Sequence, residues 1–179
     1  MFLSQCITDC KSDDHADNTT PDTLTTAIAV AEVYGWRVFA APPDVKKSYK
    51  SERHNGAKWG ATADPGEIRK DWTRWPRARI GIPTGAVNGF IVIETDTIEG
   101  HGVDGLAGLR AVEVGYGALP ETRQVMSPSG SLHRYFLHPG KRIRIPNSHG
   151  LLAPGVDVKG DGGMVIGAGS VNADGRSYR

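Results

Sequence analysis

The sequence Glu94-Thr95-Asp96 places two carboxylates two residues apart, at the end of the apolar segment 90–93. Because side chains alternate between the two faces of a strand, Glu94 and Asp96 are expected to point the same way. Carboxylates held side by side repel each other unless a positive charge lies between them, and a divalent cation such as Mg²⁺ or Mn²⁺ takes oxygen ligands. The alternative is a strand that has already reached solvent, where both acids are simply exposed.

Asp157 and Lys159 form a second pair with strand spacing, and Val156 and Val158 are expected to face the other way. Alone, the pair could be an ordinary surface salt bridge of little energetic value. Together with Glu94 and Asp96 it adds a third carboxylate and a cation. Carboxylates that hold two metal ions, with a basic side chain for phosphate, are what two-metal phosphoryl transfer requires.

Ser131-Leu132-His133 is the third group, and it follows a turn rich in glycine, proline and serine at 127–131. Ser131 and His133 are expected on one face of a strand and Leu132 on the other. His133 could donate a hydrogen bond to phosphate, although a histidine in a strand can equally be structural. Arg134 should point away from this face and is the weaker candidate.

Caps, turns and periodicity predict the elements that position these groups. Thr20 as N-cap with Pro21 starts one helix that Gly35 stops, and the spacing from Asp64 to Glu67 predicts a capping box for another. A third helix is expected at 104–114. Strands are expected at 36–40, 79–82, 90–93, 123–126, 132–137, 156–159 and 164–167.

The order of these elements implies an α+β or α/β domain. Strand 90–93 is the most apolar and should be central and buried. Two pairs of neighbouring strands are expected to be hairpins, one around the turn 127–131 and one around the turn 160–163. Trp72 and Trp75 have helical spacing, which favours packing in the core over stacking on bases.

Length and composition bound the function. A chain of 179 residues suits one domain with a full core. Residues 1–18 are polar and acidic and are expected to be a disordered leader, so the domain is predicted to span 19–179. Cys6 and Cys10 lie in that leader without zinc-like spacing, which fits incidental thiols in a reducing cytoplasm. No apolar run reaches membrane-spanning length, and the start lacks the pattern of a signal peptide.

The charge is unevenly distributed along the chain. Residues 1–32 hold six acids and one base, so the rest holds 20 bases against 14 acids. A mildly basic body suits a polyanionic partner such as nucleic acid. Segments 46–58, 69–79 and 141–144 are candidates for contact with a template or primer backbone, although each is equally an ordinary solvated surface.

The chain resembles the bifunctional primase–polymerase (prim-pol) N-terminal domain, within the archaeo-eukaryotic primase superfamily. The resemblance lies in the motif order: an acid-x-acid after an apolar strand, Ser-x-His in a hairpin strand, and one Asp on a later strand. It extends over about residues 24–179. The matching segments are Tyr34-Gly35-Trp36-Arg37-Val38-Phe39, Trp59-Gly60-Ala61-Thr62-Ala63-Asp64, Ile80-Gly81-Ile82-Pro83-Thr84-Gly85, Ser127-Pro128-Ser129-Gly130 with His133, and Gly155-Val156-Asp157-Val158-Lys159-Gly160 with Gly162-Gly163.

The resemblance implies an α+β catalytic core related to the RNA-recognition fold, with a mixed sheet flanked by helices. It implies Mg²⁺ or Mn²⁺ ligands at Glu94, Asp96 and Asp157, which would also be the catalytic residues. It implies nucleotide contacts from Ser131, His133 and Lys159. One departure stands out, because such domains usually have Asp where this chain has Glu94. The extra methylene moves the carboxylate outward by about 1 Å or more, and Mg²⁺ geometry is strict.

The leading hypothesis is therefore a DNA primase/DNA polymerase that joins (d)NTPs on a single-stranded DNA template with its primer. The chain is expected to be cytoplasmic, without membrane contact, and encoded by a phage, plasmid or bacterium. We also expect it to be a fragment of a longer replication protein with a helicase domain behind it. Two alternatives are a catalytically weak nucleotide- or DNA-binding module and a metal-dependent phosphodiesterase.

Overall fold

The computed structural model describes residues 22–179. The expected acidic leader 1–18, both cysteines, and Thr20 and Pro21 lie outside the described residues. The elements follow the order α1 (Thr23–Tyr34), β1 (Phe39–Ala41), the 3₁₀ turn η1 (Lys58–Gly60), α2 (Pro65–Arg74), β2 (Arg79–Pro83), β3 (Phe90–Thr95), α3 (Ile98–His101), α4 (Gly105–Tyr116), β4 (Gln124–Met126), β5 (Leu132–Leu137), β6 (Ser148–Ala153), β7 (Val156–Lys159) and β8 (Met164–Ile166).

Side-chain caps set the starts of the helices. The described part of α1 has Asp22 as its N-cap, whose carboxylate accepts from the Thr25 amide at 2.7 Å, so the cap is not Thr20 as expected. The predicted stop at Gly35 is confirmed, since Gly35 takes the left-handed conformation with φ 65°. The predicted start of α2 is also confirmed, because the Asp64 carboxylate accepts from the Glu67 amide at 3.0 Å. These bonds satisfy amides that the first turn leaves without partners.

The strands form two antiparallel sheets, which confirms the α+β class and corrects the expected single mixed sheet. The small sheet has the order β1-β2-β8, and the large sheet has the order β4-β5-β3-β7-β6. β3 is the central strand of the large sheet, as its apolar sequence predicts. The predicted hairpin of β4 and β5 is confirmed, with Val125 opposite His133.

The predicted hairpin of β7 and β8 is wrong. β7 pairs with β3 and β6, whereas β8 pairs with β2 in the other sheet. The turn between them is held by Asp161, whose carboxylate accepts from the amides of Ala86 at 2.8 Å and Ile145 at 2.9 Å. Thr84 Oγ1 also donates to the Gly160 carbonyl at 2.7 Å. These contacts with the β2–β3 turn and the segment before β6 lead the chain from the large sheet to the small one.

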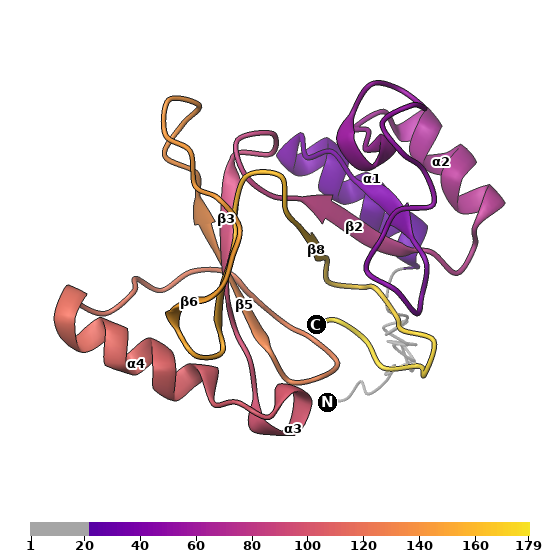
Figure 1. The fold of residues 1–179 in the computed structure, drawn as a ribbon. Coiled ribbons are helices and arrows are strands. Elements are labelled where there is room, and N and C mark those ends of the chain that lie inside the picture. Colours follow the sequence, from indigo (N-terminus) through magenta and orange to yellow (C-terminus); the bar gives the residue numbers. More distant parts are fainter. Residues whose placement is uncertain (1–21) are drawn as a thin grey trace, which may run out of the picture.

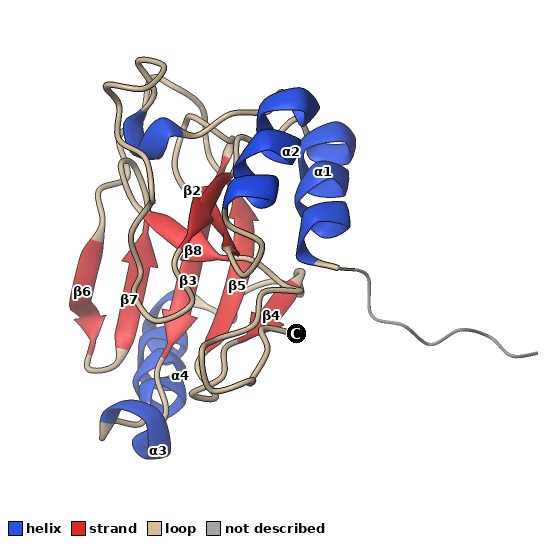
Figure 2. Ribbon diagram, turned by 90° about the vertical axis from the view of Figure 1, so that its right-hand side faces the viewer, coloured by secondary structure: helices blue, strands red, loops and turns tan. Residues whose placement is uncertain are grey.

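Helices cover the outer surfaces of the two sheets (Figures 1 and 2). α1 and α2 pack together beside the small sheet, and α4 packs on the large sheet. The helix α4 lies close to β7 and the turn before it because it carries glycines. A Cβ at Gly108 would lie 2.6 Å from the Pro154 carbonyl oxygen and 3.4 Å from Val156 Cγ2, and one at Gly105 would lie 2.1 Å from the Gly155 carbonyl oxygen. α4 therefore covers the face of the large sheet to which Val156 points.

The main core lies between the sheets and under α1 and α2. It includes Phe39, Ile80, Val92 and Tyr135, all buried. Trp72 is buried in the same core and Trp75 is partly buried against it, so the predicted core packing of this pair is confirmed. At about 25 cal/mol per Å², burial of such large apolar side chains is the main source of stability.

The remaining differences are at element boundaries. The first strand is shorter than expected and runs from Phe39, and the exposed strand β6 was not predicted because its Ser-His-Gly-Leu-Leu-Ala sequence has no alternating pattern. The short helix α3 was also missed. Among residues 22–179, no helix is long and apolar enough to cross a membrane.

Candidate active site

Three predicted site residues form a row across the centre of the large sheet. Glu94 on β3 lies opposite Asp157 on β7 and opposite His133 on β5. Directly opposed residues in antiparallel strands point to the same face, with Cβ atoms roughly 5 Å apart. This face is the one turned away from α4, and all three side chains are buried. The sheet therefore brings together residues that lie up to 63 positions apart in the sequence.

Lys159 joins two of these carboxylates. Its Nζ lies 2.9 Å from Glu94 Oε2 and 2.8 Å from Asp157 Oδ2, and the other Glu94 oxygen lies 3.2 Å from His133 Nε2. Burial alone would raise the pKa of Glu94, but the interactions with His133 and Lys159 outweigh it and hold that pKa well below its ordinary value. Burial likewise would lower the pKa of Lys159, and its two carboxylate partners raise it instead. Glu94 is thus ionised and Lys159 charged at neutral pH.

Asp157 has further partners on the edge hairpin. Its Oδ2 lies 2.7 Å from His149 Nδ1, and its Oδ1 accepts from the Gly150 amide at 3.0 Å. Burial favours a raised pKa for Asp157, yet the hydrogen bonds from Lys159 and His149 lower it overall. We call Glu94, His133, Asp157 and Lys159 the inner group.

Asp96 belongs to a separate cluster at the end of β3. It follows the last strand residue, and the chain turns there because Thr97 caps α3. Its Oδ1 accepts from Ser131 Oγ at 3.0 Å and lies 3.5 Å from His101 Nδ1. Two residues along a strand span about 7 Å, so Asp96 is set apart from Glu94. We call Asp96, Ser131 and His101 the outer group.

The inner group opens into a cavity of about 360 Å³ between the two sheets. Strand β8 forms the opposite wall, from Met164 to Ile166, and Asn147 and His149 lie at the edge. Three lysines line this cavity, Lys46, Lys58 and Lys159, against one acid, Glu94. A polyanion such as a triphosphate is the complementary ligand. Asp96 lines a different cavity of about 310 Å³, together with Thr95 and Arg134.

Lys46 reaches this cavity from a loop that Arg79 fixes. The buried Arg79 guanidinium donates to the carbonyls of Pro42 at 2.8 Å and Val45 at 2.7 Å, and to Asn172 Oδ1 at 2.6 Å. Arg79 therefore has a structural role and is not a contact for a nucleic-acid backbone. Lys50 is also excluded from that role, because its ammonium is buried 2.6 Å from Asp71.

The donor chemistry of both groups suits a hard divalent cation, although the ligands are not gathered. Carboxylate oxygens are what Mg²⁺ and Mn²⁺ prefer, and those of Glu94 and Asp157 are ionised. Within residues 22–179, however, no three Asp, Glu, His or Cys side chains lie close enough together to hold an ion as they stand. The ammonium of Lys159 lies between Glu94 and Asp157, where a bridging cation would otherwise neutralise them.

The family comparison agrees with this arrangement of motifs. The sequence model for "Bifunctional DNA primase/polymerase, N-terminal" matches residues 27–179. The chain belongs to this prim-pol family. A search of curated proteins found no match. Membership confirms the resemblance drawn from the acid-x-acid, Ser-x-His and Asp motifs, and it implies binding of DNA and nucleotides.

The structure adds prim-pol residues that sequence reasoning did not single out. Lys46, Lys58, Trp59 and His149 line the cavity of the inner group. Lys46 and Lys58 are the ends of segment 46–58, which is predicted as a candidate contact for a template or primer backbone, but nothing in the sequence places them at the same cavity as Glu94. His149 lies on the strand β6 that was not predicted. Arg134 points away as expected, and its Nη1 donates to Thr95 Oγ1 at 3.0 Å on the other face.

Proposed function

We propose that this prim-pol domain is a metal-dependent nucleotidyltransferase that extends a primer on a single-stranded DNA template from (d)NTPs during replication. The observation that carries the proposal is the meeting of the buried Glu94 and Asp157 with the half-buried Lys159 beside a cavity lined by lysines. Carboxylates for metal and ammonium groups for phosphate are the two requirements of phosphoryl transfer. In the full-length protein, a helicase domain would follow this one.

Lys46, Lys58 and Lys159 would bind the triphosphate. Each ammonium can donate three hydrogen bonds, so Lys159 can exchange its carboxylate partners for phosphate oxygens as the substrate enters. Within residues 22–179, the Lys58 ammonium donates to the Gly162 carbonyl alone, at 2.6 Å, and Lys46 lies on the loop that Arg79 fixes. The lysines thereby supply positive charge on both sides of the cavity.

Glu94, Asp96 and Asp157 would hold Mg²⁺ or Mn²⁺. When bound, such ions lower the pKa of the attacking 3′-hydroxyl and stabilise charge on the departing pyrophosphate. His133 fixes the Glu94 carboxylate at the cavity, and Ser131 fixes the Asp96 carboxylate by donating to its Oδ1. Partners of this kind fix the direction and basicity of ligating carboxylates.

Primer extension tests this function. Wild-type protein with Mn²⁺, a primed single-stranded template and dNTPs should lengthen the primer. Asp96→Asn should lower the extension rate by at least about 100-fold. Loss of a residue that only orients a metal ligand costs about 10–100-fold, and loss of an essential ligand should cost at least as much. Arg110→Ala, on the exposed face of α4, is the control with wild-type rate. Equal extension by wild type and Asp96→Asn contradicts the assignment, and release of mononucleotides indicates a phosphodiesterase.

A second candidate function is a nucleotide- or DNA-binding module with weak or no turnover. It is favoured by the engagement of both Glu94 oxygens, one with His133 and one with Lys159, which leaves neither free for a metal. Glu94→Asp separates the candidates, since the shorter side chain draws the carboxylate back from both partners. The binding-module function is supported if the wild type binds (d)NTP without extending a primer and Glu94→Asp gains Mn²⁺-dependent extension.

A further inference from the structure

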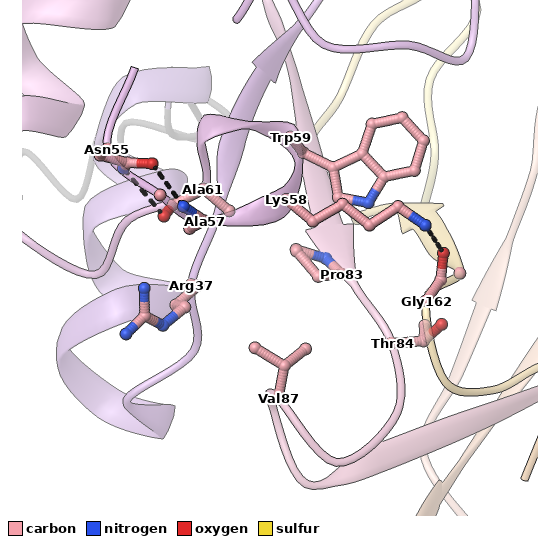
Figure 3. Close-up of a pocket in the computed structure, with 12 residues that line it drawn as sticks. Arg37, Asn55, Ala57, Lys58, Trp59, Ala61, Pro83, Thr84, Val87 and Gly162 are labelled. Atoms are coloured by element: carbon pink, nitrogen blue, oxygen red, sulfur yellow. Dashed lines mark hydrogen bonds between the residues drawn. The ribbon is translucent and has the colours of Figure 1, made fainter. Parts of the chain in front are cut away.

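A second cavity of about 490 Å³ lies next to the catalytic one and is larger (Figure 3). The two share part of their walls, namely Lys58, Trp59, Gly162 and Gly163. The rest of the second cavity comes from Arg37, the 55–57 segment, and the β2–β3 turn with Pro83 and Val87. We call it the Trp59 pocket.

Trp59 is held in this wall at a cost to the fold. Its φ of 67° is the single left-handed value at a non-glycine position among residues 22–179, and a bulky residue there is strained. Its Nε1–H is buried without a hydrogen-bond partner in the same range. The indole stacks on Phe39, with ring centroids 5.5 Å apart, and the Lys58 ammonium lies 5.1 Å from the centroid of the indole ring. Backbone strain that places an aromatic ring at a cavity wall is characteristic of binding sites.

The charge of the Trp59 pocket suits a phosphate but not a triphosphate. Its charged lining residues are Arg37 and Lys58, with no acid among them. Arg37 is exposed, and its guanidinium makes no ion pair or hydrogen bond with any residue from 22 to 179. Figure 3 shows Lys58 extended toward Gly162, with Arg37 and Val87 away from that end. Trp59, Pro83, Val87 and Ala61 supply apolar surface between the two cations.

Among residues 22–179, the uncharged polar side chains that line the pocket, Asn55 and Thr84, are already engaged. The Asn55 amide group is engaged by the carbonyls of Gly60 and Ala61 and by the Ala57 amide, and the Thr84 hydroxyl donates to the Gly160 carbonyl. The Trp59 Nε1–H has no partner in the described part of the chain but is buried, so with Arg37 left to pair with phosphate a flat base is held by stacking and apolar contact rather than by hydrogen bonds to its edge. This combination is how proteins bind single strands without sequence preference.

From these observations we propose that the Trp59 pocket holds one unpaired nucleotide of a DNA single strand, next to the catalytic cavity and regardless of its base. The base packs against Trp59, Pro83 and Val87, and the adjoining phosphate pairs with Arg37. The proposal rests on the proposed function in one respect: it makes this strand the template and leaves the triphosphate to the three lysines of the catalytic cavity.

Equilibrium binding of fluorescein-labelled dT and dA 12-mers, measured by anisotropy in EDTA, tests the pocket without requiring turnover. Val87→Asp should weaken both oligonucleotides by at least about fivefold, the low end of the loss expected for one stacked base. Val87 is 56% exposed, so the change is compatible with folding, and Val114→Asp on α4, at a position 90% exposed, is the matched control.

Arg37→Ala should also weaken DNA binding. It should reduce the steepness of the plot of log association constant against log salt concentration by about 0.7, the value for one phosphate contact on a single strand. Arg110→Ala is its control and should retain the wild-type slope. Binding of an Mn²⁺-loaded nucleoside triphosphate should be unchanged in Arg37→Ala. Trp59→Gly, which accepts the left-handed backbone, should lose strand affinity while keeping the loop folded.

Three results overturn the proposal. They are pocket variants that bind as tightly as their α4 controls, an Arg37→Ala variant that weakens binding of triphosphate rather than DNA, and a loss of affinity that differs between dT and dA. Because the binding assay contains neither metal nor substrate, failure of the wild type to extend a primer would remove the polymerase assignment and leave this test standing.

Discussion

The inner and outer groups hold the same kind of residue in different surroundings. In the inner group, Glu94 and Asp157 are buried, both are paired with the Lys159 ammonium, and Glu94 also lies 3.2 Å from His133 Nε2. In the outer group, Asp96 is partly exposed and is held by one hydroxyl and by a histidine 3.5 Å away. The comparison suggests a division of work. The inner carboxylates are buried and have several charged or polar partners, whereas the outer carboxylate is more exposed and has fewer partners to give up.

The largest expected difference between the groups is in stability. Glu94→Gln leaves the buried Lys159 with one carboxylate in place of two, and should lower the free energy of unfolding by about 3 kcal/mol, the low end for breaking a buried pair. Asp96→Asn keeps an acceptor oxygen for Ser131 and removes only the charge that strengthens this hydrogen bond, so it should cost about 1 kcal/mol or less. Urea unfolding of the two variants measures both values. Equal losses would show that the groups do not differ in this way.

The second prediction concerns Lys159 as a built-in cation. Lys159→Met leaves Glu94 and Asp157 facing each other without the ammonium between them, so the variant should be less stable and should gain more from Mn²⁺ than wild type. A bound ion stabilises by about 2.7 kcal/mol at a concentration 100 times its Kd. Thermal unfolding with and without Mn²⁺ gives the comparison. A larger Mn²⁺ effect in wild type than in Lys159→Met contradicts this role for the ammonium.

The third prediction uses pH to isolate the inner group. The folded-state pKa of Glu94 lies below its ordinary value of 4.5. The contribution of ionised Glu94 to the free energy of unfolding is therefore complete above pH 4.5 and declines as the pH falls toward the folded-state pKa. The stability gap between wild type and Glu94→Gln should therefore narrow between about pH 5 and pH 3. Urea midpoints across this range provide the measurement. A gap that is constant or widens on acidification is inconsistent with an ionised, paired Glu94.

The smallest effect is expected in the outer group. Ser131→Ala removes the hydroxyl that donates to Asp96, and should lower primer extension about tenfold, the low end for loss of a residue that orients a ligand. Stability should fall by about 1 kcal/mol. Ser131→Thr retains a hydroxyl and serves as the matched variant, with partial recovery of rate. Unchanged extension by Ser131→Ala would remove Ser131 from the site.

Local chemistry made some of the fold predictable. The bond from Asp64 to the Glu67 amide and the left-handed Gly35 follow from residue type and spacing. The apolar segment 90–93 predicted the central strand of the large sheet. Strand alternation also put Ser131 and His133 on one face, and both are buried next to the carboxylates to which they bond.

Partner choice between distant strands was not predictable from these patterns. The assignment of β7 and β8 to different sheets depends on Asp161, whose bonds to Ala86 and Ile145 join segments that no local pattern relates. The same limit applies to the site. Spacing predicted that Glu94 and Asp96 belong together, but the cross-strand register gives Glu94 its nearest carboxylate neighbour in Asp157. The remaining claim, that Asp96 shares metal ions with that pair, stays a prediction.

Mn²⁺ binding measured by electron paramagnetic resonance tests that claim most directly. Wild-type protein with a nucleoside triphosphate should bind Mn²⁺ beyond the amount that the nucleotide binds alone, and Asp96→Asn and Asp157→Asn should each remove the additional binding. Loss in both variants means that the outer carboxylate and the inner pair serve one metal site. Additional binding that survives in Asp96→Asn, or none in wild type, would contradict the account.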